Sequence, residues 1–182
     1  MIDLQSALHA NEFIVPSIYE TAVEPNRWDE VLATTSEFLG AAAAMHSLSF
    51  WASGRGKAIS FYGMMDGARS IWEANYATNE WVQTAADLPL GEILHSELPS
   101  MEVMLETPLG RDILAPHGWT DVMAVRTTDS PLFVGALSFY AMEMFSQSTL
   151  DRFEFLIPHF ARALALHQRI ERLSLDSAAF LA

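Results

Sequence analysis

The chain has 182 residues, 51% of them hydrophobic, which is the size and composition of one folded domain with a substantial core. Its 23 acidic and ten basic residues give a formal net charge of −13, so the chain by itself should repel DNA and RNA rather than bind them. The absence of cysteine excludes disulfides and thiolate metal sites, and the lack of both a membrane-length apolar run and a signal peptide predicts a cytoplasmic location without membrane contact.

Two helices are predicted at the start of the chain. The first covers residues 11–23 and ends before Pro25, with apolar residues repeating on one face. The second begins at a cap formed by Asn26, and its apolar face runs to Leu39. Gly40 follows where a helix commonly ends, because glycine adopts the left-handed conformation without steric cost.

The pattern then changes to strands. Residues 42–51 and 57–63 are rich in β-forming residues on either side of a glycine-containing turn, which predicts a β-hairpin. Asp66 is expected to cap a helix that extends to Tyr76. We expect mostly irregular structure over residues 77–98, with one short strand, because proline and glycine interrupt the pattern there.

Short helices and a second hairpin follow. Helices are predicted from Ser100 and from residues 107–108, where proline at the first helical position follows a threonine cap, and this helical region ends at residues 116–118. Strands are predicted over residues 121–126 and 132–142 because both segments are rich in β-forming residues.

The most informative segment is a long amphipathic helix predicted over residues 150–173, with a start at Ser148 and an expected kink at Pro158. Its apolar residues recur at spacings of three and four, as in helices that pack along a neighbouring helix. Because this stripe is longer than one small sheet should cover, we expect a homodimer whose interface contains Leu156, Phe160, Ala163, Ile170 and Leu173.

The order of these elements predicts an α+β fold. An antiparallel sheet carries the N-terminal helices on one face and irregular segments on the other, and a long C-terminal helix closes the domain. This is the layout of PAS and GAF sensor modules, in which the segment between the two hairpins roofs a cavity. A small apolar or amphipathic ligand is therefore expected beside Trp72, Tyr76, Trp81, His95, Trp119 and Met123.

Three short motifs support the same layout. They are Ser-Ile-Tyr-Glu-Thr-Ala-Val-Glu-Pro-Asn-Arg-Trp at 17–28, Ala-Pro-His-Gly-Trp at 115–119 and Pro-His-Phe-Ala-Arg-Ala-Leu-Ala-Leu at 158–166. Over residues 14–173 the chain resembles the N-terminal sensor region of LuxR-type helix-turn-helix transcription regulators. It departs from that family at 79–81, where Asn-Glu-Trp stands in place of the frequent Asn-Pro-Trp. The resemblance implies a sensor that contacts DNA only through a helix-turn-helix domain outside these 182 residues.

The sequence contains none of the familiar single-motif enzyme signatures, such as a hydrolase elbow, a phosphate loop or a dinucleotide-binding glycine pattern. Its six histidines are scattered, so no metal site is predicted, and no cofactor can be identified. Two other functions remain open at this point. One is a stand-alone enzyme that uses His95 or His117 with a carboxylate, and the other is a dimerisation module with a filled core and no ligand.

Overall fold

Five strands form a single sheet in the order β2-β1-β5-β4-β3, and every neighbouring pair is antiparallel. The computed structural model describes residues 1–76, 79–95, 100–128, 130 and 132–180, without the side chains of 172 and 174–180. Both predicted hairpins and the predicted short strand are confirmed. The strands are β1 (Ala43–Phe50), β2 (Arg55–Tyr62), β3 (Ile93–His95), β4 (Asp121–Arg126) and β5 (Phe133–Ala141).

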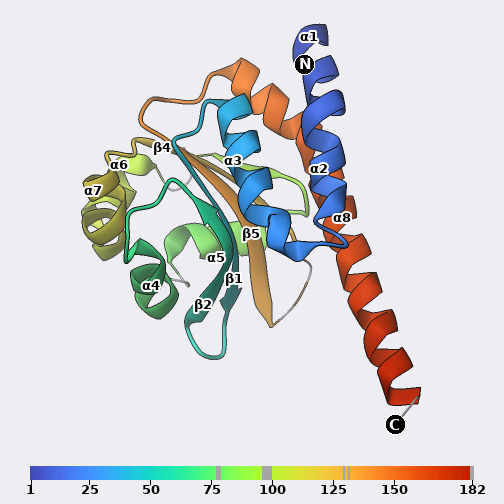
Figure 1. Ribbon diagram of the computed structural model, residues 1–182. Coiled ribbons are helices and arrows are strands. Elements are labelled where there is room, and N and C mark those ends of the chain that lie inside the picture. The colour runs from blue at the N-terminus through green and yellow to red at the C-terminus, as the bar shows by residue number, and fades with distance from the viewer. Residues whose placement is uncertain (77–78, 96–99, 129, 131, 181–182) are drawn as a thin grey trace.

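One face of the sheet, which we call the helix side, is covered by the N-terminal helices and the C-terminal helix (Figure 1). These elements are α1 (Leu4–His9), the π-helical turn η1 (Ala10–Ile14), α2 (Val15–Glu20), the 3-10 turn η2 (Pro25–Arg27), α3 (Trp28–Leu39) and α8 (Gln147–Phe180). Large apolar side chains fill the space between them and the sheet, among them Ile18, Leu32, Leu137, Phe139, Phe153 and Phe160.

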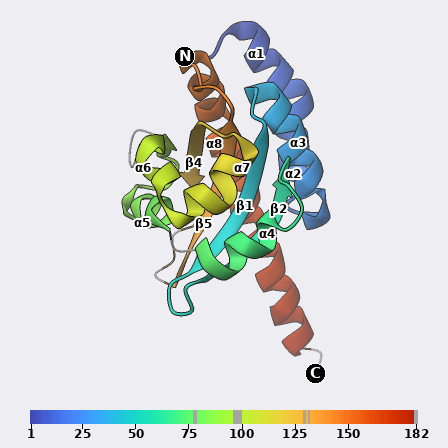
Figure 2. The ribbon, with the colours of Figure 1, turned by 90° about the vertical axis from the view of Figure 1, so that its left-hand side faces the viewer.

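The opposite face is covered by short helical segments, which we call the roof (Figure 2). The roof consists of α4 (Ala68–Ile71), the π-helical turn η3 (Trp72–Tyr76), α5 (Glu80–Asp87), α6 (Met101–Glu106), the π-helical turn η4 (Gly110–Leu114) and α7 (Ala115–His117). A second apolar cluster lies beneath it and includes Trp72, Met104, Ile113, Trp119 and Tyr140. The sheet is therefore buried on both faces.

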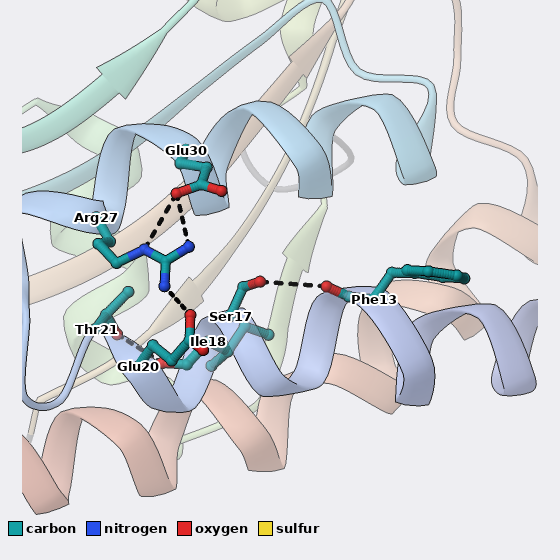
Figure 3. Close-up of polar contacts among 7 residues, drawn as sticks. All are labelled: Phe13, Ser17, Ile18, Glu20, Thr21, Arg27 and Glu30. Atoms are coloured by element: carbon teal, nitrogen blue, oxygen red, sulfur yellow. Dashed lines mark hydrogen bonds and ion pairs between the residues drawn. The ribbon is translucent and has the colours of Figure 1, made fainter.

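A polar contact between α2 and α3 fixes the turn between them (Figure 3). Arg27 donates from Nε and Nη2 to one carboxylate oxygen of Glu30, at 3.1 and 2.9 Å, and from Nη1 to Glu20. The hydrogen bonds with Glu30 raise the pKa of Arg27, so the side chain stays charged. Arg27 thus links the two helices that lie along α8.

Several predicted element boundaries were wrong. The N-terminal helix begins at Leu4 rather than near residue 11, because the Asp3 carboxylate accepts a hydrogen bond from the Ser6 N–H at 2.9 Å and caps it. The terminal helix runs over 147–180, through Pro158 and beyond the predicted end at 173. By contrast, α3 ends as predicted at Gly40, which has a φ of 68°.

The largest error is α5, which lies within a segment predicted to be mostly irregular. The Asn79 side chain accepts hydrogen bonds from the N–H groups of Trp81 and Val82, at 2.9 and 3.2 Å, and starts this helix. Glu80 occupies the first helical position, which also favours proline. The departure from Asn-Pro-Trp therefore leaves the helix start intact.

Candidate functional site

A cavity lies between the roof and the central strands of the sheet. Its volume, as the space open to the centre of a water-sized sphere, is about 50 Å³. Because one water needs roughly 10–15 Å³ by this measure, the cavity has room for a few water molecules. The sheet contributes Met45, Ser47, Leu94, Val122, Ala124, Ala136, Ser138 and Tyr140 to the lining. The roof and the residues that flank its helices contribute Met64, Ala68, Trp72, Asn79, Trp81, Val82, Ala85, Leu109, Ile113, Leu114 and Trp119.

The cavity exists because small side chains meet on the roof face of the three central strands. Ser47 on β1 pairs with Ala136 on β5, and Ser138 on β5 pairs with Ala124 on β4. These four side chains form a low floor in the middle of the sheet. Alternation along each strand then sends the intervening large residues, such as Phe139, to the helix side.

The roof is tied to the sheet at the edge strand β2. The Ala58 N–H donates to Glu73 Oε1 at 2.8 Å, and the Ala58 carbonyl accepts from Arg69 Nη2 at 2.6 Å. Arg69 and Glu73 also pair with each other at 3.1 Å. The two side chains satisfy the backbone of an edge strand and hold the turn that carries Trp72 over the cavity.

Trp119 is held rigidly at one wall. Its indole stacks between His117, at a centroid distance of 4.1 Å, and Tyr140, at 4.5 Å. Both faces of the indole are therefore covered, so the ring presents an edge to the cavity. His117 is itself fixed, because its Nδ1 donates to the Ile113 carbonyl at 2.6 Å and its Nε2 accepts from the Met65 N–H at 2.8 Å. This pattern requires a neutral imidazole.

The cavity wall is also uncharged at Tyr140. Burial raises the pKa of Tyr140 to about 12, and the hydrogen bond with Ser138 lowers it by a smaller amount. The phenol therefore stays protonated throughout the physiological pH range and remains a neutral hydrogen-bonding group.

The structure brings together three of the six residues predicted to contact a ligand, namely Trp72, Trp81 and Trp119. The other three do not line the cavity. Tyr76 lies at the outside of the roof, where its hydroxyl donates to Asp112. Met123 lies in the helix-side core, because it alternates with Val122 and Ala124 on β4.

The third, His95, forms part of a polar cluster at the end of the sheet. Its Nε2 lies 2.9 Å from Oδ2 of Asp121, a fully buried carboxylate at the start of β4. The same oxygen accepts from the Phe145 N–H at 2.7 Å, two residues before α8 begins. Asp121 therefore joins β3 and β4 to the start of the terminal helix.

The predicted dimer stripe is divided between two environments. Leu156, Phe160 and Ala163 are buried in the helix-side core, which corrects the expectation that they face a partner. Their helical spacing suits packing on the chain's own sheet and helices equally well. Ile170 is half-buried and Leu173 is 58% exposed. Both lie on the end of α8 that projects past the rest of the molecule (Figure 1).

Neither histidine proposed for an enzyme has a carboxylate partner in the cavity. His95 pairs with Asp121 outside it, and both ring nitrogens of His117 are occupied by backbone groups. Among the described residues, no three His, Asp or Glu side chains are grouped so as to hold a metal ion. None of the described helices has the length and apolar character needed to cross a membrane.

The residues of the floor were missed by sequence reasoning. Ser47, Ala124, Ala136 and Ser138 are ordinary small residues in alternating strands, and only the register of three strands brings them together. Part of the wall could have been found, because Asn79 before Glu80 is a helix start and residues 81, 82 and 85 then share one face.

No family model and no curated protein sequence matches the chain. Solved structures do match. The VqsR LBD domain from Pseudomonas aeruginosa superposes with a TM-score of 0.73 at 17% identity, over 88% of this chain and 97% of that one. The phycoerythrobilin-bound GAF domain of a cyanobacterial phytochrome gives 0.58 at 14% identity, over 88% and 97%.

A third neighbour is the GAF domain of a phosphoenolpyruvate-protein phosphotransferase from Coxiella burnetii, with a TM-score of 0.55 at 12% identity, over 92% of this chain and 99% of that one. Identities this low establish the fold and nothing more specific. The predicted fold class is confirmed: the chain has the α+β fold of GAF-like sensor domains.

Proposed function

We propose that this chain is the ligand-responsive sensor domain of a transcription regulator, and that it binds a small apolar or amphipathic molecule in the cavity under the roof. The observation that carries the proposal is the cavity itself: it lies at the middle of the sheet, and its described lining is apolar apart from a few neutral polar groups. The likeness to sensor domains supports this, since one neighbour is described as phycoerythrobilin-bound.

The proposed route of the signal runs through Asp121. Val122 and Ala124 of β4 form part of the cavity lining, and Asp121 precedes them on the same strand. A ligand that displaces β4 or β3 changes the hydrogen bonds from Asp121 to Phe145 and His95, and thereby the position at which α8 begins. The domain then acts by a shift of α8 and has no catalytic step of its own.

We propose that the signal leaves the domain through the projecting end of α8. His167 bonds to the Ala22 carbonyl at 3.2 Å, and the helix continues for 13 residues to Phe180, about 20 Å at the usual helical rise. We propose that this segment, with Ile170 and Leu173, forms the contact between two copies. A helix-turn-helix domain outside these residues would contact DNA, and the regulator would act in the cytoplasm.

Melting experiments with a variant that fills the cavity test the ligand site. Phenol and 1-decanol serve as probes of two sizes, and Ala136→Leu places a large side chain on the cavity floor. A ligand at a hundred times its Kd stabilises the folded state by about 2.7 kcal/mol, which raises the Tm of a domain this size by about 5–10 °C. We expect at least one probe to raise the Tm of the wild type and not that of Ala136→Leu.

The matched control is Ala161→Leu, which adds the same side chain at an exposed position on α8. It should respond to the probes as the wild type does. If neither probe raises the Tm, or if Ala136→Leu responds like Ala161→Leu, the cavity is not the binding site and the proposed function is contradicted.

A further inference from the structure

We infer that the ligand is an uncharged molecule with a single aromatic ring and one hydrogen-bonding group, and that the Ser47 hydroxyl recognises this group. The inference deepens the proposed function and rests on it, because it assumes that the cavity binds a ligand. Four features of the cavity carry it: the charge of its lining, its size, the edge of Trp119 and the environment of Ser47.

The lining of the cavity disfavours charged ligands. None of the 19 described residues that line the cavity is Asp, Glu, Lys, Arg or His. A charged group moved from water into such a site loses its hydration and gains no opposite charge in return, which costs far more than the transfer of a neutral polar group. Carboxylates and amines should therefore be rejected.

The volume of the cavity favours a small ligand. A space of about 50 Å³ holds only a few water molecules. It is about a third of the roughly 150 Å³ cavity that accepts benzene in another protein. A single ring therefore fits with a small outward movement of the roof, whereas a long acyl chain requires a much larger one.

The wall favours an aromatic ring over an aliphatic one of the same size. Because His117 and Tyr140 cover both faces of Trp119, its edge is the part that faces the cavity. The edge of an aromatic ring carries partial positive charge and prefers the negative face of a second ring. Trp72 adds an indole that stacks on no other described ring.

Ser47 supplies the polar contact. The residue is 2% exposed and lines the cavity, and in the described part of the chain its hydroxyl makes no hydrogen bond. The nearby Ser138 differs, because its hydroxyl is hydrogen-bonded to Tyr140. The hydroxyl is not one of the fully enclosed side-chain atoms that lack a partner, so it is open to the cavity. A ligand hydroxyl, carbonyl or N–H directed at Ser47 gains a neutral hydrogen bond there, and this bond fixes the orientation of the ring.

Four small probes of similar size separate these features by calorimetric titration of the full chain. Phenol has the ring and the hydroxyl, toluene lacks the hydroxyl, cyclohexanol lacks the aromatic ring, and benzoate adds a charge. We expect phenol to bind with the lowest Kd, toluene and cyclohexanol more weakly, and benzoate not at all. Ala136→Leu should abolish phenol binding, whereas Ala161→Leu should retain it.

A serine substitution then tests the polar contact. Ser47→Ala should weaken phenol binding about three- to tenfold, the range of one neutral hydrogen bond, and leave toluene binding unchanged. Ser49→Ala is the matched control, because Ser49 is equally buried two residues further along β1 but does not line the cavity. Its Kd for phenol should equal that of the wild type.

The outcomes distinguish this inference from the proposed function. Equal binding of phenol and cyclohexanol, binding of benzoate, or an unchanged Kd for phenol in Ser47→Ala would overturn the inference. If only 1-decanol binds, and Ala136→Leu abolishes that binding, the proposed function stands and the ligand class is wrong. If no probe binds in a manner that Ala136→Leu disrupts, both fail.

Discussion

The two faces of the sheet are built from the same strands but packed in opposite ways. On β5, Leu137 and Phe139 point to the helix side and are completely buried among large side chains. Between and beside them, Ala136 and Ser138 point to the roof side and leave a cavity. The helix side is therefore densely packed, whereas the roof side is packed more loosely around the cavity in which we propose that a ligand binds.

Truncation of one residue on each face should give the largest contrast. Phe139→Ala removes a fully buried ring that contacts Phe153 at a centroid distance of 5.2 Å, and it should lower the free energy of unfolding by about 3–5 kcal/mol. Ser138→Ala, one residue away on the other face, should cost less than about 1.5 kcal/mol. Urea denaturation measures both, and comparable losses would contradict the division between the faces.

The dense packing of the helix side also predicts acid sensitivity. Burial lowers the pKa of His46 to about 4 from 6.5, and the charge of the nearby His167 adds to the effect. Because the unfolded chain binds a proton below pH 6.5 and the folded chain does not, the stabilising contribution is complete above pH 6.5. It is lost as the pH falls toward 4, by about 3 kcal/mol in total.

His46→Phe removes this titration and keeps a ring beside Trp28, which lies 4.5 Å from the His46 centroid. Between pH 7 and 4.5 the wild type should therefore lose about 2–3 kcal/mol more than the variant. His9→Phe, at an exposed position, should behave as the wild type. Parallel pH profiles of wild type and His46→Phe would show that the buried imidazole is not the cause.

Enlargement of an alanine should have opposite signs on the two faces. Ala44 is completely buried on the helix side and pairs with Phe139, so Ala44→Leu overpacks the core and should cost about 1–3 kcal/mol. Ala136→Leu enters the cavity and should leave the free energy of unfolding unchanged or raise it by up to about 2 kcal/mol. A loss in Ala136→Leu as large as in Ala44→Leu would mean that the roof side has no usable space.

The smallest effect on stability is expected at the projecting end of α8. Leu173→Glu should change the free energy of unfolding by less than about 0.5 kcal/mol, but it should convert a dimer to a monomer in analytical ultracentrifugation at tens of micromolar chain. Leu132→Glu, at an exposed leucine before β5, is the control and should leave the mass unchanged. A monomeric wild type would contradict the proposed dimer.

The periodicity of the sequence was sufficient for most of the sheet and for α3, because alternation and helix-stop residues are local. The periodicity could not show which face of the sheet a strand residue points to, or what the apolar face of a helix packs against. Met123 was placed near the ligand because it follows closely after the segment expected to form the roof, yet the alternation along β4 sends it to the helix side. The stripe of Leu156, Phe160 and Ala163 was assigned to a partner, although identical spacing serves packing within one chain.

The candidate site was predictable only in its aromatic part. Trp72, Trp81 and Trp119 line the cavity, and all three lie in the segment between the two hairpins, which was expected to form its roof. The floor depends on the absence of bulk at Ser47, Ala124, Ala136 and Ser138, and a cavity formed by small residues on three strands has no local pattern. The coverage of both faces of the Trp119 indole is likewise visible only in the three-dimensional structure.

The central claim is that occupation of the cavity changes α8, and hydrogen–deuterium exchange tests it most directly. The rates are measured with and without a saturating probe, phenol or 1-decanol, whichever raises the Tm more. We predict slower exchange in the roof together with changed exchange at the start of α8, and loss of the second effect alone in Asp121→Asn, which weakens the link to Phe145. Protection confined to the roof, with α8 unchanged in the wild type, would contradict the account.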